Sequence, residues 1–482
     1  MEISDIGLKP PMSRLSLLFS VLIAVLLLQS CRTTPEMPPK QQYISVYQTK
    51  ADKSVLLQLV DTIPFSGSSV QHIPELLMDT SIRFQPVEGF GAALTGSSAY
   101  VLNRYLDSGT RIQLLKELFT PDGAGMDYLR ITIGASDFSL RDFSYNDTEG
   151  DTMMSNFSLR EDHTDLIPVL KEILQINPDL KIMASPWSAP GWMKTNGSMT
   201  GGRLKREFFP AFARYLSVYI MEMNKLGIPI DAISVQNEPL HGSAAYPCMD
   251  MPAADQRDFI RDHLGPEFRR KNIAAKILLY DHNWDRPLYA DTILQDKQAA
   301  EYAWGTAFHA YGGTPSAMSE LKKLHPDKAV YFTEISGGRW APVFGDNLKW
   351  YAENIIIGTM QHWSRNALFW NLALDENDGP QNRGCANCRG VVTVTSTGAV
   401  QRNEEYYALA HAGKFIRQNA YRIHTQLNIP DLQQVGFIQP DGSKVLLVLN
   451  KNAETQRFSI REGDRKVEVA IEGNAFYTLT WH

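Results

Sequence analysis

The feature that most constrains the fold is an alternation of apolar, strand-like runs with amphipathic, helix-like stretches that begins at residue 87. In Glu207–Leu226, for example, aromatic and aliphatic residues recur at helical spacing. Successive parallel strands need such crossover helices, so eight units predict an α/β fold, a (β/α)8 TIM barrel. The expected strands are Val87–Ala92, Tyr128–Ile133, Leu180–Pro186, Asp231–Gln236, Ala275–Tyr280, Thr306–His309, Lys328–Thr333 and Ala367–Asn371. The expected helices are Tyr100–Phe119, His163–Ile176, Glu207–Leu226, Ala254–Lys271, Tyr289–Glu301, Pro315–Leu324, Asn347–Trp363 and Glu404–Arg417.

The two flanks of this alternation have a different pattern. Tyr43–Val60 contains strand-like runs, and after Tyr421 short strands alternate with turn signals such as Pro440-Asp-Gly442. Strands before the barrel cannot bury a face alone, so we expect them to join those that follow it in a small all-β sandwich. The expected later strands are Gln434–Ile438, Val445–Asn450, Phe458–Arg461, Lys466–Ile471 and Ala475–Thr480.

The amino terminus has the pattern of a targeting segment. Lys9 and Arg14 precede an apolar run, Leu15–Leu28, that is short for a membrane-spanning helix, and Leu28-Gln-Ser-Cys31 resembles a bacterial lipobox. We expect export and a lipid anchor on Cys31; the alternative is a secretory signal or uncleaved anchor with an incidental cysteine. The expected ranges are a signal peptide with its lipobox cysteine over 1–31, a flexible tether over 32–42, N-terminal sandwich strands over 43–83, the barrel over 84–420 and the C-terminal sandwich over 421–482.

Charge and cysteine content narrow the function classes. The formal net charge of −6 is made of interspersed signs without a basic block, so we expect no nucleic-acid partner. We also find no sign of an obligate protein partner. Cys385 and Cys388 form a Cys-x-x-Cys in a Gly- and Asn-rich loop, where a small disulfide is favoured over a zinc site that lacks two further ligands. Cys248 is expected to be a lone buried thiol.

Two of the predicted strands each carry one glutamate at the carboxyl end. These strands are Ile233-Ser-Val-Gln-Asn-Glu-Pro239, with Glu238, and Val330-Tyr-Phe-Thr-Glu-Ile335, with Glu334. Burial disfavours a carboxylate in such a position, so it needs a function or a buried partner. As strands 4 and 7 of a barrel, the two can face each other across its mouth, which is the minimal equipment for cleaving a glycosidic bond. The alternative is a structural carboxylate pair.

Other strand ends supply groups suited to a sugar pocket. Arg130 on the second strand is a candidate to keep Glu334 ionised, or to form a structural ion pair in the barrel. Placement near the core is expected to raise the pKa of the acid, Glu238. Asp281, His282, Asn283 and Trp284 are expected to rim the pocket. Their grouping with His309 lacks the spacing of a recognised metal site, so we expect no metal and no cofactor.

Four segments resemble glycoside hydrolase family 30, which includes glucosylceramidases, β-1,6-glucanases and some xylanases. They are Glu88-Gly-Phe-Gly-Ala-Ala-Leu-Thr95, Trp187-Ser-Ala-Pro-Gly-Trp-Met-Lys-Thr-Asn-Gly197, Val235-Gln-Asn-Glu-Pro239 and Trp370-Asn-Leu-Ala-Leu-Asp375. The tryptophan-containing run is highly specific, and the resemblance extends from about residue 43 to the carboxyl terminus. A departure follows the first strand, where Leu94-Thr95-Gly96 lacks the aspartate that many members have.

The resemblance implies a role for each matching residue. Glu238 matches the acid/base and Glu334 the nucleophile of a reaction that retains the anomeric configuration. Asn237 matches a residue that hydrogen-bonds the sugar 2-hydroxyl. The remaining matches are Asp137, Trp187 and Trp370, at positions that contact the terminal glucose, and His309 and Tyr311, beside the nucleophile.

We therefore expect a retaining β-glycosidase that acts on β-linked glucose. The loop Gly384-Cys-Ala-Asn-Cys-Arg-Gly390 resembles the β-1,6-glucanase subgroup, and export suits polysaccharide scavenging. The alternative in the same class is a glucosylceramidase or broad β-glucosidase. Two alternatives of other classes are a non-catalytic glycan-binding lipoprotein and a metal-dependent barrel hydrolase.

Overall fold

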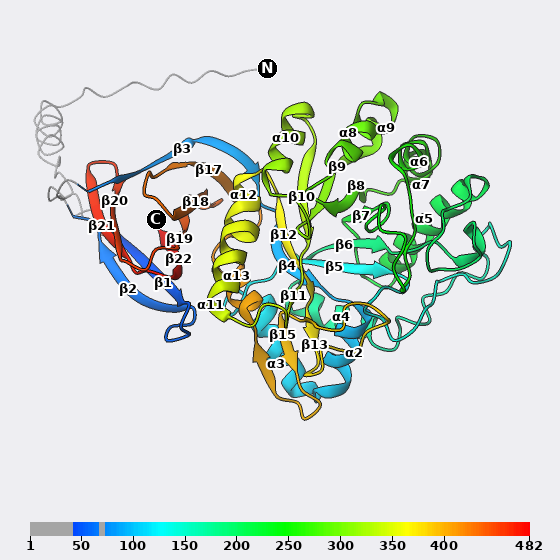
Figure 1. Ribbon diagram of the computed structural model, residues 1–482, viewed down its shortest axis with the longest axis horizontal. Coiled ribbons are helices and arrows are strands. Elements are labelled where there is room, and N and C mark those ends of the chain that lie inside the picture. Colours follow the sequence, from blue (N-terminus) through cyan, green and yellow to red (C-terminus); the bar gives the residue numbers. More distant parts are fainter. Residues whose placement is uncertain (1–41, 67–72) are drawn as a thin grey trace, which may run out of the picture. The chain divides into compact units, whose positions relative to one another are not determined.

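The computed structural model describes residues 42–66 and 73–482, and Tyr43–His482 form one compact unit (Figure 1). The expected signal peptide, the tether up to residue 41 and Cys31 lie outside the described residues. Among the described residues, no helix is both long and apolar enough to cross a membrane.

Eight parallel strands form the barrel, in the sheet order β10-β9-β8-β7-β6-β5-β4-β12. The ring is completed between β12 and β10 by backbone hydrogen bonds from Arg365 N to Val330 O (2.9 Å) and from Trp370 N to Ile335 O (2.8 Å). Each of the eight strands expected from the sequence is present, and the TIM-barrel prediction is confirmed. The strands are β4 (Gly89–Ala93), β5 (Tyr128–Ile133), β6 (Lys181–Pro186), β7 (Ala232–Ser234), β8 (Lys276–Asn283), β9 (Ala303–His309), β10 (Ala329–Glu334) and β12 (Asn366–Asn371).

Several expected helices are divided in the structure. The stretch Tyr100–Phe119 is two helices, because the chain is extended at Leu106 and Asp107, and the Asp107 side chain caps the second helix through the Thr110 amide. The helical segments are α2 (Gly96–Tyr105), α3 (Ser108–Phe119), α4 (Leu166–Ile176), η1 (Gly191–Met193), η2 (Arg206–Phe208), α5 (Phe209–Lys225), α6 (Ala253–Phe259), η3 (Ile260–Leu264), α7 (Gly265–Lys271), α8 (Leu288–Leu294), α9 (Lys297–Tyr302), α10 (Ser316–Leu324), α11 (Phe344–Trp350), η4 (Tyr351–Gly358), α12 (Thr359–Gln361) and α13 (Glu404–Gly413). The segments η3 and η4 are π-helical.

The flanking strands form the β-sandwich, in the sheet order β2-β1-β22-β19-β18-β17-β3-β20-β21. Strands from both ends of the chain are neighbours in it, as expected. Two strands were not predicted, β3 and β17; β3 carries exposed apolar residues such as Leu77 and Ile82, so its pattern does not alternate cleanly. The strands are β1 (Tyr43–Lys50), β2 (Gln58–Pro64), β3 (Glu75–Pro86), β17 (Tyr421–Gln426), β18 (Leu432–Ile438), β19 (Lys444–Asn450), β20 (Gln456–Glu462), β21 (Arg465–Ile471) and β22 (Ala475–Trp481).

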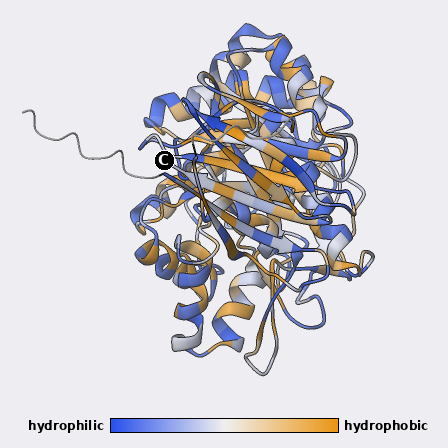
Figure 2. Ribbon diagram, turned by 90° about the vertical axis from the view of Figure 1, so that its left-hand side faces the viewer, coloured by the Kyte–Doolittle hydropathy of each residue, from blue (hydrophilic) through white to orange (hydrophobic). Residues whose placement is uncertain are grey.

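Strand β19 contributes to two hydrophobic cores at once. Leu446 and Val448 lie in the sandwich core, while Leu447 and Leu449 on the opposite face belong to the larger core that also contains the barrel helices. Successive side chains of a strand point to opposite faces, so a strand buried on both faces is apolar throughout. Figure 2, which faces the sandwich, shows hydrophobic bands running through these strands. This double burial packs the sandwich against the barrel.

Candidate active site

The two glutamates lie at the carboxyl ends of barrel strands, where local backbone irregularities aim side chains into the mouth. Glu334 is the last residue of β10, and Glu238 follows β7. The strand register shifts at Phe332/Glu334, and again at Tyr280/His282 on β8. Such bulges reorient side chains and are frequent beside active sites. Three non-glycine residues, Glu238, Tyr280 and Asp281, also have left-handed backbone at φ 44, 71 and 55°, a strained conformation that clusters at functional sites.

His309, the last residue of β9, contacts both glutamates. Its Nδ1 lies 3.1 Å from Glu238 Oε1 and 3.8 Å from Glu334 Oε1. The two carboxylate oxygens therefore lie at most 6.9 Å apart. The Tyr311 hydroxyl, two residues further along, donates to Glu334 Oε1 at 3.0 Å. The structure therefore brings together the four residues that the sequence placed on three separate strand ends.

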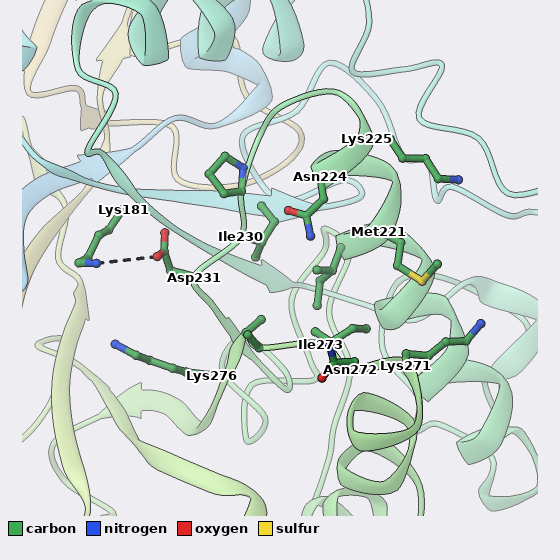
Figure 3. Close-up of a pocket in the computed structure, with 14 residues that line it drawn as sticks. Lys181, Met221, Asn224, Lys225, Ile230, Asp231, Lys271, Asn272, Ile273 and Lys276 are labelled. Atoms are coloured by element: carbon green, nitrogen blue, oxygen red, sulfur yellow. Dashed lines mark ion pairs between the residues drawn. The ribbon is translucent and has the colours of Figure 1, made fainter. Parts of the chain in front are cut away.

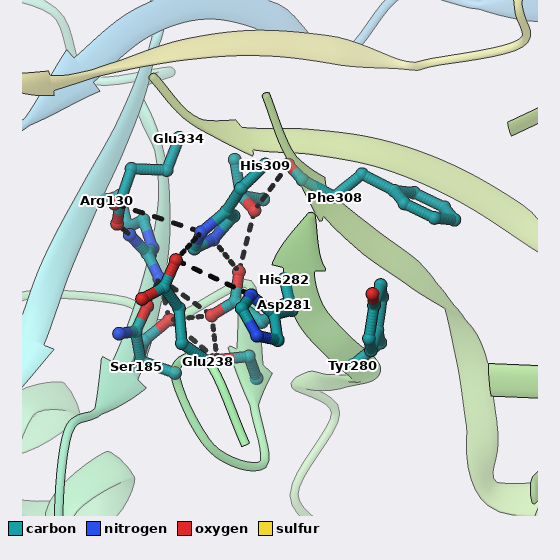
Figure 4. Close-up of polar contacts among 12 residues, drawn as sticks. Arg130, Ser185, Glu238, Tyr280, Asp281, His282, Phe308, His309 and Glu334 are labelled. Atoms are coloured by element: carbon teal, nitrogen blue, oxygen red, sulfur yellow. Dashed lines mark hydrogen bonds and ion pairs between the residues drawn. The ribbon is translucent and has the colours of Figure 1, made fainter. Parts of the chain in front are cut away.

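Arg130 is fully buried beneath the pair and binds four acceptors, each on or directly after a different strand. Its guanidinium forms an ion pair with Glu334 and donates to Asp281 Oδ2 at 2.7 Å and to Asn237 Oδ1 at 2.8 Å (Figure 4). Its Nε donates to Ser185 Oγ at 3.2 Å. Arg130 was expected either to keep Glu334 ionised or to form a structural ion pair. Both interpretations require a buried carboxylate partner, and Arg130 has two, Glu334 and Asp281.

Asp281 was expected at the pocket rim, and this expectation is wrong. Its side chain is fully buried, because β8 continues through Asn283 and turns the aspartate under the site. Asp281 Oδ1 lies 3.0 Å from His309 Nε2 and accepts from the Thr333 hydroxyl at 2.7 Å. Trp284, also expected at the rim, is likewise buried. The signal in the sequence was an aspartate directly after an apolar strand, the same signal that identified the two glutamates.

The pKa values of Glu238 and Glu334 shift in the directions opposite to those expected from the sequence. Burial raises the pKa of Glu334, although His309 and Arg130 act against it. Burial acts in the same direction on Glu238, but the neighbouring imidazoles of His282 and His309 outweigh it and hold the pKa of that carboxyl well below its usual range. His309 is itself fully buried, yet Glu334, Asp281 and Glu238 together raise its pKa to about 9. The sequence did not reveal that two imidazoles face Glu238.

Two buried tryptophans form a wall beside Arg130. Trp187 and Trp370 are stacked, with ring centroids 5.0 Å apart, and Arg130 Cζ lies 4.9 and 5.5 Å from the two ring centroids. Asp137 lies nearby, and burial, followed by the charges of Glu334 and Glu238, raises its pKa well above the usual range. Asp137 Oδ1 is buried and has no hydrogen-bond partner among the described residues. Buried polar atoms are rarely left unpaired, so this oxygen is suited to a ligand hydroxyl.

A disulfide-bonded loop closes over this wall. Cys385 and Cys388 are bonded to each other, and Cys388 packs in the same cluster as Trp187 and Trp370. The loop approaches Asp137 so closely that a Cβ on Gly384 would lie 2.6 Å from Asp137 Cβ, which requires glycine there. The short strand β14 (Cys388–Arg389) pairs with β11 (Gly337–Gly338), in the loop after Glu334. Cys248, in contrast, is a free buried thiol, as expected.

The first βα loop, where the sequence departs from the family pattern, has a structural role. The Thr95 side chain caps α2 by accepting from the Ser98 amide at 3.1 Å. Its hydroxyl also donates to Asn371 Oδ1 at 2.9 Å, at the end of β12. Thr95 thus joins the first and last strands of the barrel, while no carboxylate follows it to reach toward a ligand.

A separate pocket of about 780 Å³ lies at the opposite end of the strands (Figure 3). Its lining includes Lys181, Asp231 and Lys276, which stand at or just before the starts of β6, β7 and β8. Lys181 and Asp231 form an ion pair at 3.8 Å. In TIM-barrel enzymes the catalytic groups lie at the carboxyl ends of the strands, so this pocket is distinct from the candidate active site.

Similarity to known proteins extends over both domains. Residues 87–416 match the "Glycosyl hydrolase family 30 TIM-barrel domain", and residues 419–479 match the "Glycosyl hydrolase family 30 beta sandwich domain". The chain is 32% identical to "Putative glucosylceramidase 1" of Caenorhabditis elegans over 89% of this chain and 86% of that protein. It is 33% identical to "Endo-1,6-beta-D-glucanase neg1" of Aspergillus fumigatus over 76% and 78% of the two chains.

A solved structure described as "The endo-beta1,6-glucanase BT3312" resembles the whole described fold. It superposes with a TM-score of 0.84 at 31% identity and covers 91% of this chain and 99% of its own. The family resemblance stated from the sequence motifs is therefore confirmed. With its barrel and sandwich both matched and the paired glutamates at the barrel mouth, the chain belongs to glycosyl hydrolase family 30.

Proposed function

We propose that this enzyme is a retaining β-glycosidase in which Glu334 is the nucleophile and Glu238 the acid/base. The single observation that carries the proposal is that one nitrogen, His309 Nδ1, lies within 4 Å of a carboxylate oxygen of each glutamate. Inverting glycosidases separate their carboxylates by about 6.5–9.5 Å to admit a water, whereas retaining enzymes hold them about 5–5.5 Å apart. The two distances cap the separation of these oxygens at 6.9 Å, which excludes most of the inverting range and so favours direct attack on the sugar.

The reaction then takes two steps. A Glu334 oxygen bonds to the anomeric carbon as the glycosidic C–O bond breaks, and Glu238 gives its proton to the departing oxygen. A water next attacks the same carbon while Glu238 accepts its proton, and the bond to Glu334 breaks. Arg130 keeps a positive charge beside Glu334 and so favours its ionised form as nucleophile.

The proton must be on Glu238 when the substrate is bound, although the neighbouring imidazoles favour its loss in the unliganded enzyme. Interacting carboxyls titrate as a pair, so the position of the shared proton depends on what each oxygen contacts. A glycosidic oxygen beside Glu238 accepts a hydrogen bond only from the protonated form. Substrate binding thus moves the proton of the pair onto the residue that will donate it.

The sugar pocket is built from residues around the pair. We propose that Asp137 Oδ1, which lacks a partner among the described residues, accepts from a glucose hydroxyl. Asn237 is oriented by Arg130 through its Oδ1, and we expect its amide nitrogen to donate to the ligand. The full set of proposed sugar contacts is Asp137, Trp187, Asn237, His309, Tyr311 and Trp370.

For the substrate we propose a β-1,6-linked glucan. Support comes from the endo-1,6-β-glucanases among the relatives and from the disulfide-bonded loop that forms part of the pocket. The test is hydrolysis of β-1,6-, β-1,3- and β-1,4-glucans and of glucosylceramide, with product lengths determined by chromatography and the first anomer formed by NMR. We expect β-anomeric products from the β-1,6-glucan, and none from the Glu334→Gln variant. Faster release of glucose from glucosylceramide would replace this substrate with the alternative of the same class.

We also propose that the enzyme is exported and anchored by a lipid on Cys31. Support comes from the sequence alone: Lys9 and Arg14, then the apolar run Leu15–Leu28, then Leu28-Gln-Ser-Cys31. Metabolic labelling with radioactive palmitate in a bacterial host tests the anchor. The label should appear in the wild type and be lost in Cys31→Ala.

A further inference from the structure

Three nitrogen and oxygen atoms in the barrel mouth form a group with the chemistry of a cation site. They come from Glu238, His282 and His309, each of which offers one ligand atom within 4.8 Å of the other two. The glutamate oxygen is 3.1 Å from the His309 nitrogen and 3.6 Å from the His282 nitrogen. Bonds of about 2.0–2.1 Å in a tetrahedral zinc site place neighbouring ligand atoms about 3.3 Å apart. Two of the three separations are therefore already close to those of a metal site.

The contacts behind His309 match those of a histidine that binds metal. Its Nε2 lies 3.0 Å from Asp281 Oδ1, and Asp281 is fully buried and held by the Ser234 and Thr333 hydroxyls at 2.5 and 2.7 Å. A carboxylate on the outer nitrogen orients the imidazole, so that the inner nitrogen faces the metal. Here the inner nitrogen is Nδ1, which faces Glu238.

His282 is the ligand whose ring nitrogen is left without a partner in the described part of the chain. His282 Nδ1 is buried and has no hydrogen-bond partner within accepted distance among the described residues. The side chains of His282 and Glu238 keep 12 and 14% of their surface exposed, so both border the barrel mouth. Glu334 Oε1 lies 3.8 Å from His309 Nδ1, so a second carboxylate borders the same space. The group lies in a pocket whose carboxylates outnumber its permanent cations.

We propose that Glu238, His282 and His309 bind one divalent cation of the zinc type, and that the bound cation inhibits the enzyme. Two imidazoles and one carboxylate suit Zn²⁺, whereas Mg²⁺ and Ca²⁺ prefer oxygen ligands throughout. The cation occupies Glu238 Oε1 and so removes the proton donor of the reaction. Binding stands on the geometry alone, while inhibition rests on the proposed role of Glu238.

Isothermal titration calorimetry of the purified, EDTA-treated protein with ZnCl₂ tests the binding. We expect one site with micromolar or tighter affinity and no heat with MgCl₂. His282→Asn and Glu238→Gln should each weaken binding at least tenfold. The matched control is His325→Asn, which removes a histidine paired with Asp291 at 2.8 Å away from the site and should leave the titration unchanged. Thermal unfolding in EDTA verifies that each variant is folded.

The outcomes separate the two parts of the proposal. Absence of binding up to millimolar zinc, or binding that folded His282→Asn and Glu238→Gln retain, overturns the site. Glycosidase assays of the wild type should lose activity over the same zinc concentrations as the titration and recover it with EDTA. Stoichiometric binding without loss of activity would uphold the site and overturn the assignment of Glu238 as proton donor.

Discussion

Each end of the barrel buries a glutamate against basic residues, but the pKa of the glutamate is lowered at one end and raised at the other. At the amino-terminal end, Glu88 contacts Lys276 Nζ at 2.9 Å, Arg365 at 3.1 Å and the Tyr331 hydroxyl at 2.9 Å. These contacts outweigh burial and lower the pKa of Glu88. At the carboxyl-terminal end, Glu334 has Arg130 as its permanent cation, shared with Asp281, and burial raises its pKa.

The difference lies in the local balance of charge. Two cations serve one carboxylate at the amino-terminal end, so the charge of Glu88 is compensated and the site is complete without a ligand. At the other end Arg130 serves two carboxylates, with Glu238 and Asp137 close by, and Asp137 Oδ1 lacks a partner among the described residues. A protein tolerates such an excess where the ligand or the reaction uses it. The amino-terminal end thus serves stability alone, while the carboxyl-terminal end also carries the proposed catalytic pair.

The largest expected effect is on activity, and it distinguishes Glu334 from Glu88. Glu334→Gln should lower kcat about 10⁴-fold, since the amide cannot bond to the anomeric carbon. Glu88→Gln should leave kcat within about threefold of the wild type, because it lies at the end of the barrel remote from the reaction. Steady-state hydrolysis of the preferred glucan measures both. A comparable loss of kcat in folded Glu88→Gln would end the division of roles.

Removing the shared cation should damage both stability and activity. Arg130→Met leaves Asp281 and Glu334 buried without it, and breaking a buried pair costs about 3–5 kcal/mol, so we expect a loss of about 5 kcal/mol. Urea unfolding measures this loss. Arg130→Lys is the matched control: it keeps the charge but cannot reach Glu334, Asp281 and Asn237 together, and should lose less. Equal stability of Arg130→Met and the wild type would show that the charges at this end are balanced by other groups.

At the amino-terminal end, substitution of Glu88 should cost less stability than the loss of Arg130, and the cost should depend on pH. Glu88→Gln removes one partner of a nearly buried pair, for which we expect about 3 kcal/mol at pH 7. The folded pKa of Glu88 lies below its unfolded value, so its contribution is complete above the unfolded pKa and is lost as pH falls through the folded pKa. Urea unfolding of wild type and variant at decreasing pH should show the difference shrinking. A difference that grows toward acid pH would contradict the lowered pKa.

The sequence predicted the strands better than it predicted the environment of the site. Strand Tyr128–Ile133 has the predicted bounds, because a fully buried parallel strand is marked by continuous apolar residues. Glu238 and Glu334 were found because a carboxylate interrupts that pattern. The burial of Asp281 depends on the bulge and left-handed backbone at the end of β8, and the contact between Glu88 and Lys276 joins residues 188 positions apart. Neither leaves a local signal, so both required the structure.

The smallest expected effect concerns the loop that covers the functional end. In the double variant Cys385→Ser/Cys388→Ser, the loop loses its covalent closure and the packing of Cys388 beside Trp187 and Trp370. We expect kcat/KM to fall about fivefold, which corresponds to about 1 kcal/mol, mainly through KM, because Trp187 and Trp370 are proposed to contact the sugar without reacting with it. The control is Cys248→Ser, at the free thiol, assayed on the same glucan.

Dithiothreitol provides the same comparison without mutation, since it should reproduce the fivefold loss in the wild type and leave the double variant unchanged. A loss confined to kcat would instead place the effect on Glu334, through the pairing of β14 with β11 in the loop that follows it. The loop would then belong to the reacting part of the carboxyl-terminal end. A change in KM alone would limit its role to holding the wall against which the sugar binds.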